Sequence, residues 1–449
     1  MPASLPRLAL IGGLVLTASA CSWSRFDDLT GNAPVLLLEK PASMTGGFGV
    51  SLATASNQGD HVLVGGTVGS SGVALYQLEA PTFGYVIYSN AYCTGEGQPC
   101  FLSSLTAGLA NGQFQTPGVS RVRCFAVGSG ALAAEQGLIV HCANANEYTL
   151  RMPQPAQDLL AQAIAQNQPR DFPMATDRGD DPVLLASLPE KHLAWFYPQM
   201  STTFSELALP AAAQVNDPSF GKALAVLAVD GGHVLALGVS GKSEVFLWKT
   251  AGGTNSTYLG CLGGHSGMGR ALASGRVNSD ASDDLVVSDD SQVHVIDGAA
   301  LFQLPEATSA ECGLSSLPTG AVLGSVACGS TSDVSGCETS AFGAALAVGD
   351  LDGDGDGEVI VGAPKMTVRG EENAGALLVY DAEVTNFSAL VEARFMSSAE
   401  AGDELGQSIV TPHNGKRDII AAGAPGHGKA ALFYCSSLLA PGKAGQRCP

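Results

Sequence analysis

The stretch from Phe342 to Pro364 reads FGAALAVGDLDGDGDGEVIVGAP, and GALLVYD follows it from Gly375. It begins with a Phe-Gly turn and a run of small apolar residues, passes through a loop of alternating aspartate and glycine, and continues as a second apolar run. Short apolar, β-branched runs bounded by glycine and aspartate are typical of β-strands. This segment therefore predicts three consecutive strands of one sheet.

The same order of features recurs about seven times along the chain. Clear copies begin at Phe48, with FGVSLATASNQGDHVLVGG, and at Phe220, with FGKALAVLAVDGGHVLALG. Weaker copies begin near residues 124, 171, 268 and 405, and a fourth strand is expected in several copies, as in 204–210 and 389–395. Each copy is too short to bury a core alone, so the repeats indicate units that are stacked or arranged radially.

Seven four-stranded units predict an all-β fold, a seven-bladed β-propeller of four-stranded antiparallel blades, because radial closure leaves few exposed sheet edges. The segment VLLLEK (35–40) precedes the first copy and has no partner there. We expect it to form the outer strand of the last blade and close the ring. The segment AQDLLAQAIAQN (156–167) has a helical composition but falls where a fourth strand belongs, so helix and strand both remain open.

Composition limits the classes of function. The 449 residues include 56 glycines, only 14% are charged, and the formal net charge is −20. A hydrophobic content of 45% supports a large core and excludes an intrinsically disordered chain. Because an acidic surface repels phosphate, we expect no nucleic-acid partner; the same surface attracts cations.

The N-terminus has the pattern of a secretory signal. Arg7 precedes an apolar run from Leu8 to Leu16, and small residues lead to Cys21. The run 17–21 resembles a bacterial lipobox with Ala18 in place of the usual leucine, which implies that residues 1–20 are a lipoprotein signal peptide and that Cys21 is lipidated. A plain signal peptide with an incidental cysteine is the alternative. We expect export and a lipid anchor, on the outer membrane because no aspartate follows Cys21, and membrane contact through that anchor only. Residues 21–43 would then form the tether and closing strand, and 44–449 the propeller.

The remaining ten cysteines are an even number, as expected in an oxidising compartment. No two have the short spacing of a zinc site. We expect them to pair with their neighbours along the chain, although sequence alone leaves the connectivity open. The expected pairs are Cys93 with Cys100, Cys124 with Cys142, Cys261 with Cys312, Cys328 with Cys337, and Cys435 with Cys448.

The loop within the opening stretch carries the clearest chemistry. Acids recur at every second position, at Asp350, Asp352, Asp354, Asp356 and Glu358, mostly separated by glycines. Ca²⁺ takes about six to eight oxygen ligands, and a tight glycine-rich loop lets alternate side chains converge on one ion, whereas Mg²⁺ demands a stricter octahedral geometry. A solvated acidic turn is the alternative, but so many adjacent carboxylates repel one another unless a cation is present.

The repeated phrase resembles the FG-GAP repeat of integrin α-subunit propellers and related bacterial proteins, over roughly residues 44 to 449. The resemblance implies a seven-bladed propeller with calcium loops between the first two strands of some blades. It implies that Asp350, Asp352 and Asp354 supply carboxylates, Asp356 its carbonyl, and Glu358 the closing carboxylate, where the family usually has aspartate. In the copy at 268, Arg276 occupies the first ligand position, and the loops near 57, 230 and 414 are too short to surround an ion. We therefore expect one structural Ca²⁺.

Three other patterns are interpreted as parts of the scaffold. Arg178-Gly179-Asp180 matches an adhesion tripeptide but falls where the polar loop of a blade belongs. His61 and His233 precede equivalent strands, which indicates a repeat position rather than a metal site. The segment GGHSGMG (263–269) lacks the GxSxG spacing of a nucleophile elbow, and the chain has no HExxH, phosphate-loop or dinucleotide motif.

In an antiparallel blade, loops between strands one and two, or three and four, lie on one face of the ring, and all other connections lie on the opposite face. We expect the insertions 79–123 and 298–341 to project mostly from the face opposite the calcium loop. The sequence thus predicts a calcium-stabilised envelope or cell-surface propeller that binds a protein or glycan through that face. The alternatives are a polysaccharide-active lyase or hydrolase, since propellers also host enzymes, and a structural subunit of an outer-membrane complex.

Overall fold

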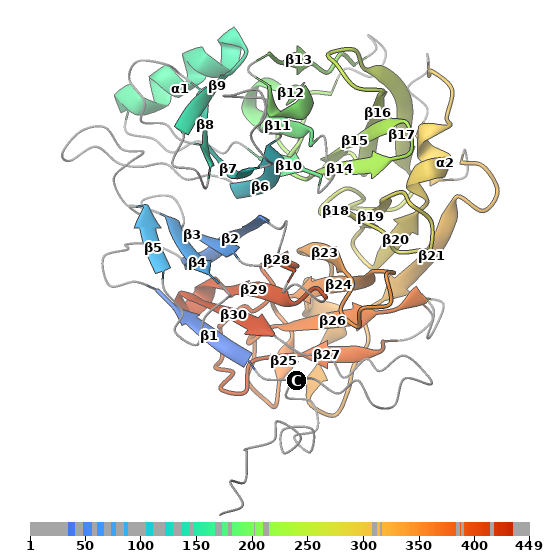
Figure 1. Cartoon of the computed structure of the whole chain (residues 1–449). Coiled ribbons are helices and arrows are strands. Elements are labelled where there is room, and N and C mark those ends of the chain that lie inside the picture. The colour runs from blue at the N-terminus through green and yellow to red at the C-terminus, as the bar shows by residue number, and fades with distance from the viewer. Residues whose placement is uncertain are drawn as a thin grey trace, which may run out of the picture.

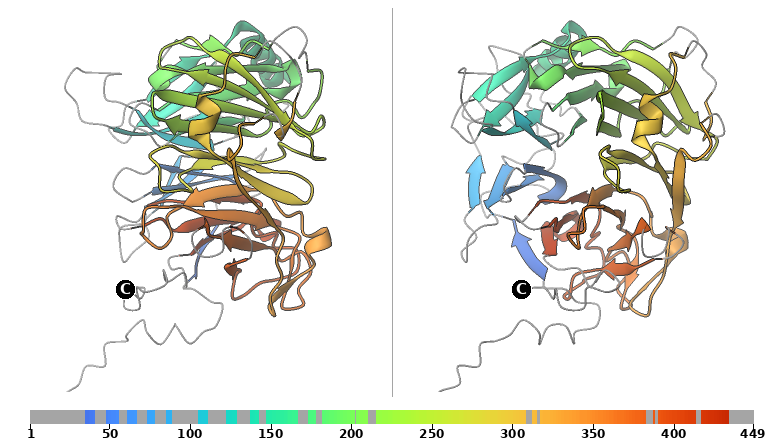
Figure 2. Two further views of the ribbon diagram at one scale, coloured as in Figure 1. Left: turned by 90° about the vertical axis from the view of Figure 1, so that its right-hand side faces the viewer. Right: turned by 45° about the vertical axis from the view of Figure 1, so that its right-hand side comes forward.

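The computed structural model describes most of the chain, in ranges separated by gaps: 35–40, 48–55, 61–66, 73–77, 85–88, 105–110, 122–128, 137–142, 147–166, 173–177, 182–201, 203–209, 215–307, 312–314, 317–382, 387, 390–413 and 417–433. In these ranges, seven four-stranded antiparallel sheets surround a common centre (Figures 1 and 2). The predicted all-β propeller is confirmed. The sheets are numbered here as blades 1 to 7 along the chain.

Each blade runs from an inner strand near the ring centre to an outer strand at the rim. Blade 1 consists of β2 (Phe48–Ala55), β3 (His61–Gly66), β4 (Val73–Gln77) and β5 (Tyr85–Tyr88), and blade 2 of β6 (Leu105–Ala110), β7 (Val122–Gly128), β8 (Gly137–Cys142) and β9 (Glu147–Arg151). Blade 3 consists of β10 (Met174–Thr176), β11 (Leu184–Leu188), β12 (Leu193–Tyr197) and β13 (Ser205–Glu206). Blade 4 consists of β14 (Leu224–Val229), β15 (Gly232–Val239), β16 (Glu244–Thr250) and β17 (Thr257–Gly263).

The last three blades follow the same order, apart from a small additional sheet. Blade 5 consists of β18 (Leu272–Gly275), β19 (Asp284–Ser288), β20 (Gln292–Ile296) and β21 (Val322–Ala327), and blade 6 of β23 (Leu346–Gly349), β24 (Glu358–Ala363), β26 (Ala376–Tyr380) and β27 (Glu392–Arg394). Blade 7 consists of β28 (Ser408–Val410), β29 (Ile420–Ala424), β30 (Lys429–Phe433) and β1 (Val35–Glu39). The small sheet pairs β22 (Val334–Ser335) with β25 (Thr367–Val368), and the helices are α1 (Gln154–Gln166) and α2 (Gly298–Phe302).

Blade 7 is built from both ends of the described chain. Strand β1 pairs antiparallel with β30, from Val35 opposite Phe433 to Glu39 opposite Lys429. This is the place predicted for residues 35–40. The N-terminal strand therefore covers an edge that would otherwise leave backbone groups unpaired.

The hydrophobic core lies between neighbouring blades rather than at the ring centre. On β24, Val359 and Val361 belong to a buried cluster shared with blade 5, whereas Ile360 between them belongs to a cluster shared with blade 7. Successive strand residues point to opposite faces, and both faces are covered. This explains why the middle strands of the repeats are apolar without interruption.

The glycines of the repeated phrase bring adjacent blades together. A Cβ added to Gly362, at the end of β24, would lie 2.1 Å from the carbonyl oxygen of Gly406 in the next blade. At the ring junction, a Cβ on Gly423 would lie 1.7 Å from the carbonyl oxygen of Gly49. Only glycine allows backbones to approach this closely. In both places, the glycine near the end of one blade's second strand thus fits against the glycine at the start of the next blade, Gly406 after Leu405 and Gly49 after Phe48.

Two expectations from the sequence are wrong in detail. Residues 122–128 form the second strand of blade 2, not the first, because 105–110 supplies the inner strand. This shift resolves the open question at 156–167: residues 156–166 lie in helix α1, after the outer strand of blade 2, and replace no strand, while residue 167 lies outside the described residues.

The two supposed insertions also contain blade strands. The range 79–123 includes β5 and the inner strand β6, and the range 298–341 includes α2 and the outer strand β21. The first part of 298–341, up to residue 321, joins the third and fourth strands of blade 5, so it starts on the face that carries the acidic loop 350–357. Only 328–341 connects two blades on the opposite face. The expected fourth strands near 204–210 and 389–395 are present as β13 and β27.

Candidate metal centre

The acidic loop of residues 350–357 connects β23 to β24, the first two strands of blade 6. The Asp350 carboxylate accepts hydrogen bonds from the backbone N–H groups of Gly353 (2.6 Å) and Gly355 (3.1 Å). Both glycines have positive φ angles, +84° and +104°, which most other residues adopt only with strain. The glycines therefore let the loop fold around the Asp350 side chain.

The next two aspartates organise the remainder of the loop. Asp352 Oδ1 accepts from Asp354 N, and Asp354 Oδ1 accepts from Asp356 N, each at 3.0 Å. One carboxylate oxygen from each of Asp350, Asp352 and Asp354 lies within 4.8 Å of the other two. The structure thus brings together the three residues expected to supply carboxylates, while the carboxylates of Asp356 and Glu358 lie outside this group.

Glu358 lies beneath the loop, with 3% of its surface exposed. Its Oε2 accepts a hydrogen bond from Leu351 N at 2.6 Å. Burial raises the pKa of Glu358 to about 9 although the Leu351 bond opposes the change, and burial together with the Asp354 charge raises that of Asp352 to about 6. Burial also raises the pKa of Asp350. A nearby cation favours the ionised form of every one of these carboxylates, which is the electrostatic setting of a metal site.

A second loop of the same design lies one blade earlier, at 276–283. Asp280 N donates to Asn278 Oδ1 (3.0 Å), Ser282 N to Asp280 Oδ1 (2.7 Å), and Val277 N to Asp284 Oδ2 (3.0 Å). These three bonds repeat those of Asp354, Asp356 and Leu351 in the first loop. The two loops differ at the first position, where Arg276 stands in place of Asp350. As expected from the sequence, that position offers no carboxylate.

Two aspartates that the sequence reasoning missed join adjacent blades beside these loops. Asp283 N donates to Ala228 O (2.8 Å), and its Oδ2 accepts from Ala228 N (3.0 Å). Asp418 of blade 7 makes the same two hydrogen bonds with Asp350: Asp418 N donates to Asp350 O at 2.7 Å, and Asp418 Oδ2 accepts from Asp350 N at 3.2 Å. The acidic loop is therefore fixed to the next blade through its first residue.

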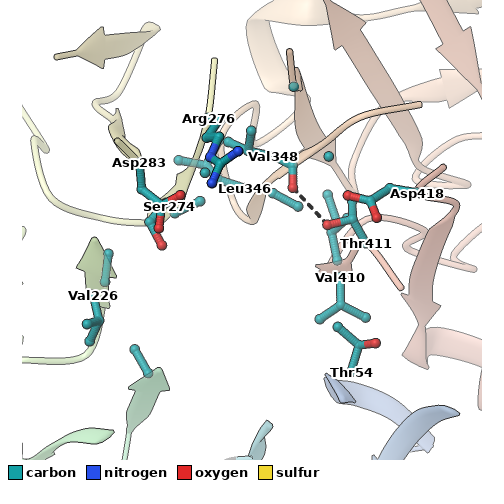
Figure 3. Close-up of a pocket in the computed structure, with 18 of the residues that line it drawn as sticks. Thr54, Val226, Ser274, Arg276, Asp283, Leu346, Val348, Val410, Thr411 and Asp418 are labelled. Carbon is teal, nitrogen blue, oxygen red and sulfur yellow. Dashed lines mark hydrogen bonds between the residues drawn. The ribbon is translucent and has the colours of Figure 1, made fainter. Parts of the chain in front are cut away.

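The inner strands of six blades surround a central cavity of about 450 Å³ (Figure 3). Among its lining residues, Arg276 and Asp283 lie on one side and Asp418 on the other. Thr411 Oγ1 donates to Val348 O at 2.8 Å and links two of the inner strands. The described lining includes no histidine, tyrosine or cysteine. Of its aspartates, Asp283 and Asp418 accept hydrogen bonds from backbone groups of adjacent blades, whereas the Asp350 carboxylate accepts from Gly353 N and Gly355 N of its own loop.

The cysteines that the structure describes lie in or beside the blades. Cys261 of β17 forms a disulfide with Cys312 (Cα–Cα 4.7 Å), and Cys328 forms one with Cys337 (5.7 Å), as predicted. Cys124 and Cys142 are opposite each other in the register of β7 and β8. Cys21, Cys93, Cys100, Cys435, Cys448 and the tripeptide 178–180 lie outside the described residues.

The two histidines assigned to a repeat position lie at the starts of second strands, His61 in β3 and His233 in β15. His233 is buried, and its Nε2 lies 3.6 Å from Asp177 Oδ2. Ser266 of the 263–269 segment donates to Asp290 Oδ2 at 2.8 Å. Across the described part of the chain, no helix combines the length and apolar character needed to span a bilayer.

Comparison with known protein families gives a match on the blade that carries the acidic loop. Residues 342–380 match the FG-GAP repeat family. A stretch of 104 residues, 22% of this chain, is 38% identical to integrin alpha-7 of Homo sapiens, and the same holds for the proteins of Rattus norvegicus and Mus musculus. The match spans only 9% of the length of these integrins.

Solved structures with a similar arrangement have low sequence identity. A virginiamycin B lyase from Staphylococcus aureus gives a TM-score of 0.49 at 11% identity, covering 89% of this chain and 99% of that one. A chain of the mitotic checkpoint complex gives 0.48 at 12%, covering 91% and 97%. At these TM-scores and identities, neither structure supports an inference about the function of this protein. What the matches identify is an FG-GAP repeat at residues 342–380, set in the sixth blade of this β-propeller.

Proposed function

We propose that this protein is an exported binding propeller that holds one Ca²⁺ in the loop 350–358 and recognises a protein or glycan through the opposite face of the ring. The observation that carries the proposal is the convergence of the Asp350, Asp352 and Asp354 carboxylates within 4.8 Å, in the blade that matches the FG-GAP family. Export through the signal 1–20 and lipidation of Cys21 at the outer membrane belong to the proposal and rest on the sequence of residues 1–21.

Asp350, Asp352 and Asp354 would hold the ion, with the Asp356 carbonyl and Glu358 completing the set. The bound ion supplies positive charge that lets the carboxylates remain ionised together. Because Asp350 is bonded to Asp418 of blade 7, and Gly357 N donates to Arg276 O of blade 5 at 2.6 Å, the loop contacts both neighbouring blades. A fixed loop would therefore stabilise the ring across three blades.

The opposite face carries the small sheet β22–β25, fastened by the Cys328–Cys337 disulfide. Arg369, next to β25, forms an ion pair with Asp333 (3.0 Å) and lies over the ring of Phe395 (4.8 Å). Glu371 and Glu372 follow and are exposed. Loops fixed to a rigid scaffold are common recognition sites. The polysaccharide-active alternative gains no support from the described cavity lining, where Asp283 and Asp418 form contacts between blades and Asp350 belongs to the acidic loop.

Calcium binding is tested by isothermal titration with Asp354→Asn and the matched control Asp280→Asn, which removes the equivalent acid from the loop with Arg276. We expect one Ca²⁺ per wild-type chain, retained in Asp280→Asn and weakened at least tenfold in Asp354→Asn. Ca²⁺ at about 100 times its Kd should raise the free energy of unfolding by about 2.7 kcal/mol relative to the protein in chelator. Equal affinity in the two variants would place calcium elsewhere.

The binding face is tested on arrays of defined glycans and envelope proteins with Glu371→Lys/Glu372→Lys, against Ser279→Lys on the calcium-loop face. Charge reversal in the contact region weakens an interface, whereas a distant surface charge does not. We expect the double variant to lose the wild-type hits and Ser279→Lys to keep them. Loss of binding in Ser279→Lys alone would indicate that recognition takes place on the face that carries the acidic loop.

A further inference from the structure

Three convergent side chains on blade 5 form a cluster separate from the acidic loop: His265, Asp289 and His294, called here the His-Asp-His cluster. His265 lies in the connection between β17 and β18, Asp289 in the turn between β19 and β20, and His294 on β20. Asp289 Oδ2 lies 2.8 Å from His294 Nε2 and 3.4 Å from His265 Nδ1. One ligand atom from each residue lies within 4.8 Å of the other two.

The surrounding residues hold these atoms in place. The second oxygen of Asp289 accepts from the N–H groups of Ser291 and Gln292, each at 2.6 Å, which leaves Oδ2 directed at the histidines. His294 Nδ1 lies 2.8 Å from Ser325 Oγ of β21, so its Nε2 faces Asp289. Metal-binding histidines usually have such a partner on the second ring nitrogen.

The cluster also departs from the repeat at two buried positions. The cross-strand pair of Val287 and His294 corresponds to Leu237 with Phe246 in blade 4, Val361 with Leu378 in blade 6, and Ala422 with Ala431 in blade 7. The residues equivalent to Asp289 are Val239, Ala363 and Ala424. All six of these counterparts of His294 and Asp289 are at most 2% exposed and apolar, whereas Asp289 and His294 are 1% and 3% exposed.

The two polar residues lower the stability of the blade, and the fold does not require them at these positions. Placing an ionised carboxylate and an imidazole where other blades bury aliphatic or aromatic groups loses apolar burial and requires desolvation. The propeller scaffold is satisfied by apolar residues there in three sister blades. The two polar residues therefore serve something other than the packing of the blade.

We propose that the His-Asp-His cluster is a site for a divalent transition-metal ion of the zinc class, bound by His265 Nδ1, His294 Nε2 and Asp289 Oδ2. Imidazole nitrogens with one carboxylate suit Zn²⁺, Co²⁺ and their neighbours, whereas Ca²⁺ prefers an all-oxygen set. The side chain of His265 is 45% exposed, so the site opens to solvent on one side. Three protein ligands leave a fourth position for water or a donor group of a ligand.

The site lies on the face opposite the acidic loop, because it is formed by a connection between blades and by a turn between second and third strands. The two metals are therefore separable by experiment. His427 provides a matched control: it is 42% exposed and its Nδ1 lies 2.9 Å from Asp403 Oδ1, so it is a similar His-Asp pair.

The test is titration of tag-free, metal-stripped protein with Co²⁺ followed by its visible absorption, with Zn²⁺ competition and calorimetry. We expect one Co²⁺ per chain with the bands of a low-coordinate site, displaced by Zn²⁺, and retained in Asp350→Asn and His427→Ala. His265→Ala should weaken binding by roughly tenfold or more, and Ser325→Ala should weaken it less. Circular dichroism checks that His265→Ala, an exposed change, remains folded.

The proposal is overturned if wild-type protein gives no such bands and no Zn²⁺ binding at micromolar metal. It is equally overturned if His265→Ala and His427→Ala bind Co²⁺ alike, or if Asp350→Asn abolishes Co²⁺ binding. Asp289→Asn gives a second independent reading, since it removes the charged ligand with little change in shape. Retention of wild-type affinity in that folded variant would exclude Asp289 as a ligand.

Discussion

At the scale of single residues, the sequence predicts a ligand when its position follows a local pattern. Alternating acids predicted that Asp350, Asp352 and Asp354 act together, and their carboxylates do converge because all three lie in one loop. Asp418 was missed because it reaches Asp350 from the next blade, although it stands two residues before β29, much as Asp283 directly precedes β19. His294 was missed because its partners come from two other segments; the signal was a histidine where the equivalent strands have Phe246, Leu378 and Ala431.

Asp284 provides a prediction at this scale. Its side chain is fully buried, its oxygens accept from Val277 N (3.0 Å) and Gly298 N (3.1 Å), and burial raises its pKa to about 7. The folded state therefore binds a proton that the unfolded state has released above its ordinary pKa. This stabilisation is present at low pH and is lost as the pH rises toward 7, by up to about 1.4 kcal/mol per pH unit.

The measurement is the free energy of unfolding in denaturant at pH 5, 6, 7 and 8 for wild type and Asp284→Asn. Asparagine has no charge to lose, so the difference in unfolding free energy between variant and wild type should shift in favour of the variant as the pH rises to 7. A difference that does not change with pH would show that Asp284 is ionised throughout this range.

At the scale of strands and turns, apolar runs and glycines predicted most elements but not their order within every blade. Blade 2 was shifted by one strand because its inner strand, LTAGLA at 105–110, has small residues and no Phe-Gly turn before it. The more apolar CFAVG therefore resembled a first strand. Periodicity identifies a buried strand but does not say which strand of a blade it is.

The strand-end glycine provides the prediction for this scale. Gly362→Ala would place a methyl group 2.1 Å from Gly406 O, which requires two blades to move apart. We expect a loss of about 2–4 kcal/mol of unfolding free energy. Gly370→Ala is the control: its φ is +92° but no atom lies within 4 Å, so only backbone strain of about 1–2 kcal/mol applies. Equal losses in the two variants would mean that contact between blades does not require the glycine.

At the scale of the whole molecule, a ring of seven sheets depends on its closure. The sequence predicted this closure because VLLLEK had no partner near it, and strand β1 pairs along its length with β30. The face on which a loop lies follows from the order of the strands. Because blade 2 is shifted by one strand and 298–341 contains strand β21, parts of the expected binding segments lie on the same face as the acidic loop.

Deletion of residues 35–40 should open the ring. The exposed edge of β30 would then offer unpaired backbone groups, so we expect a lower Tm and association that increases with protein concentration. A synthetic peptide of residues 33–41 should restore the Tm by adding the strand in trans, and a scrambled peptide should not. A deletion variant that stays monomeric with an unchanged Tm would mean that β1 is dispensable for closure.

The central claim is that one calcium ion is held by the acidic loop of blade 6 and none by its sister loop in blade 5. It is tested most directly by a crystal structure grown with Ca²⁺ and measured for anomalous signal. We predict one peak among the carboxylates of Asp350, Asp352 and Asp354, at about 2.3–2.6 Å from their oxygens, and no peak in the loop 276–283. A loop 350–357 without a peak at millimolar Ca²⁺, or a peak beside Arg276 instead, would contradict it.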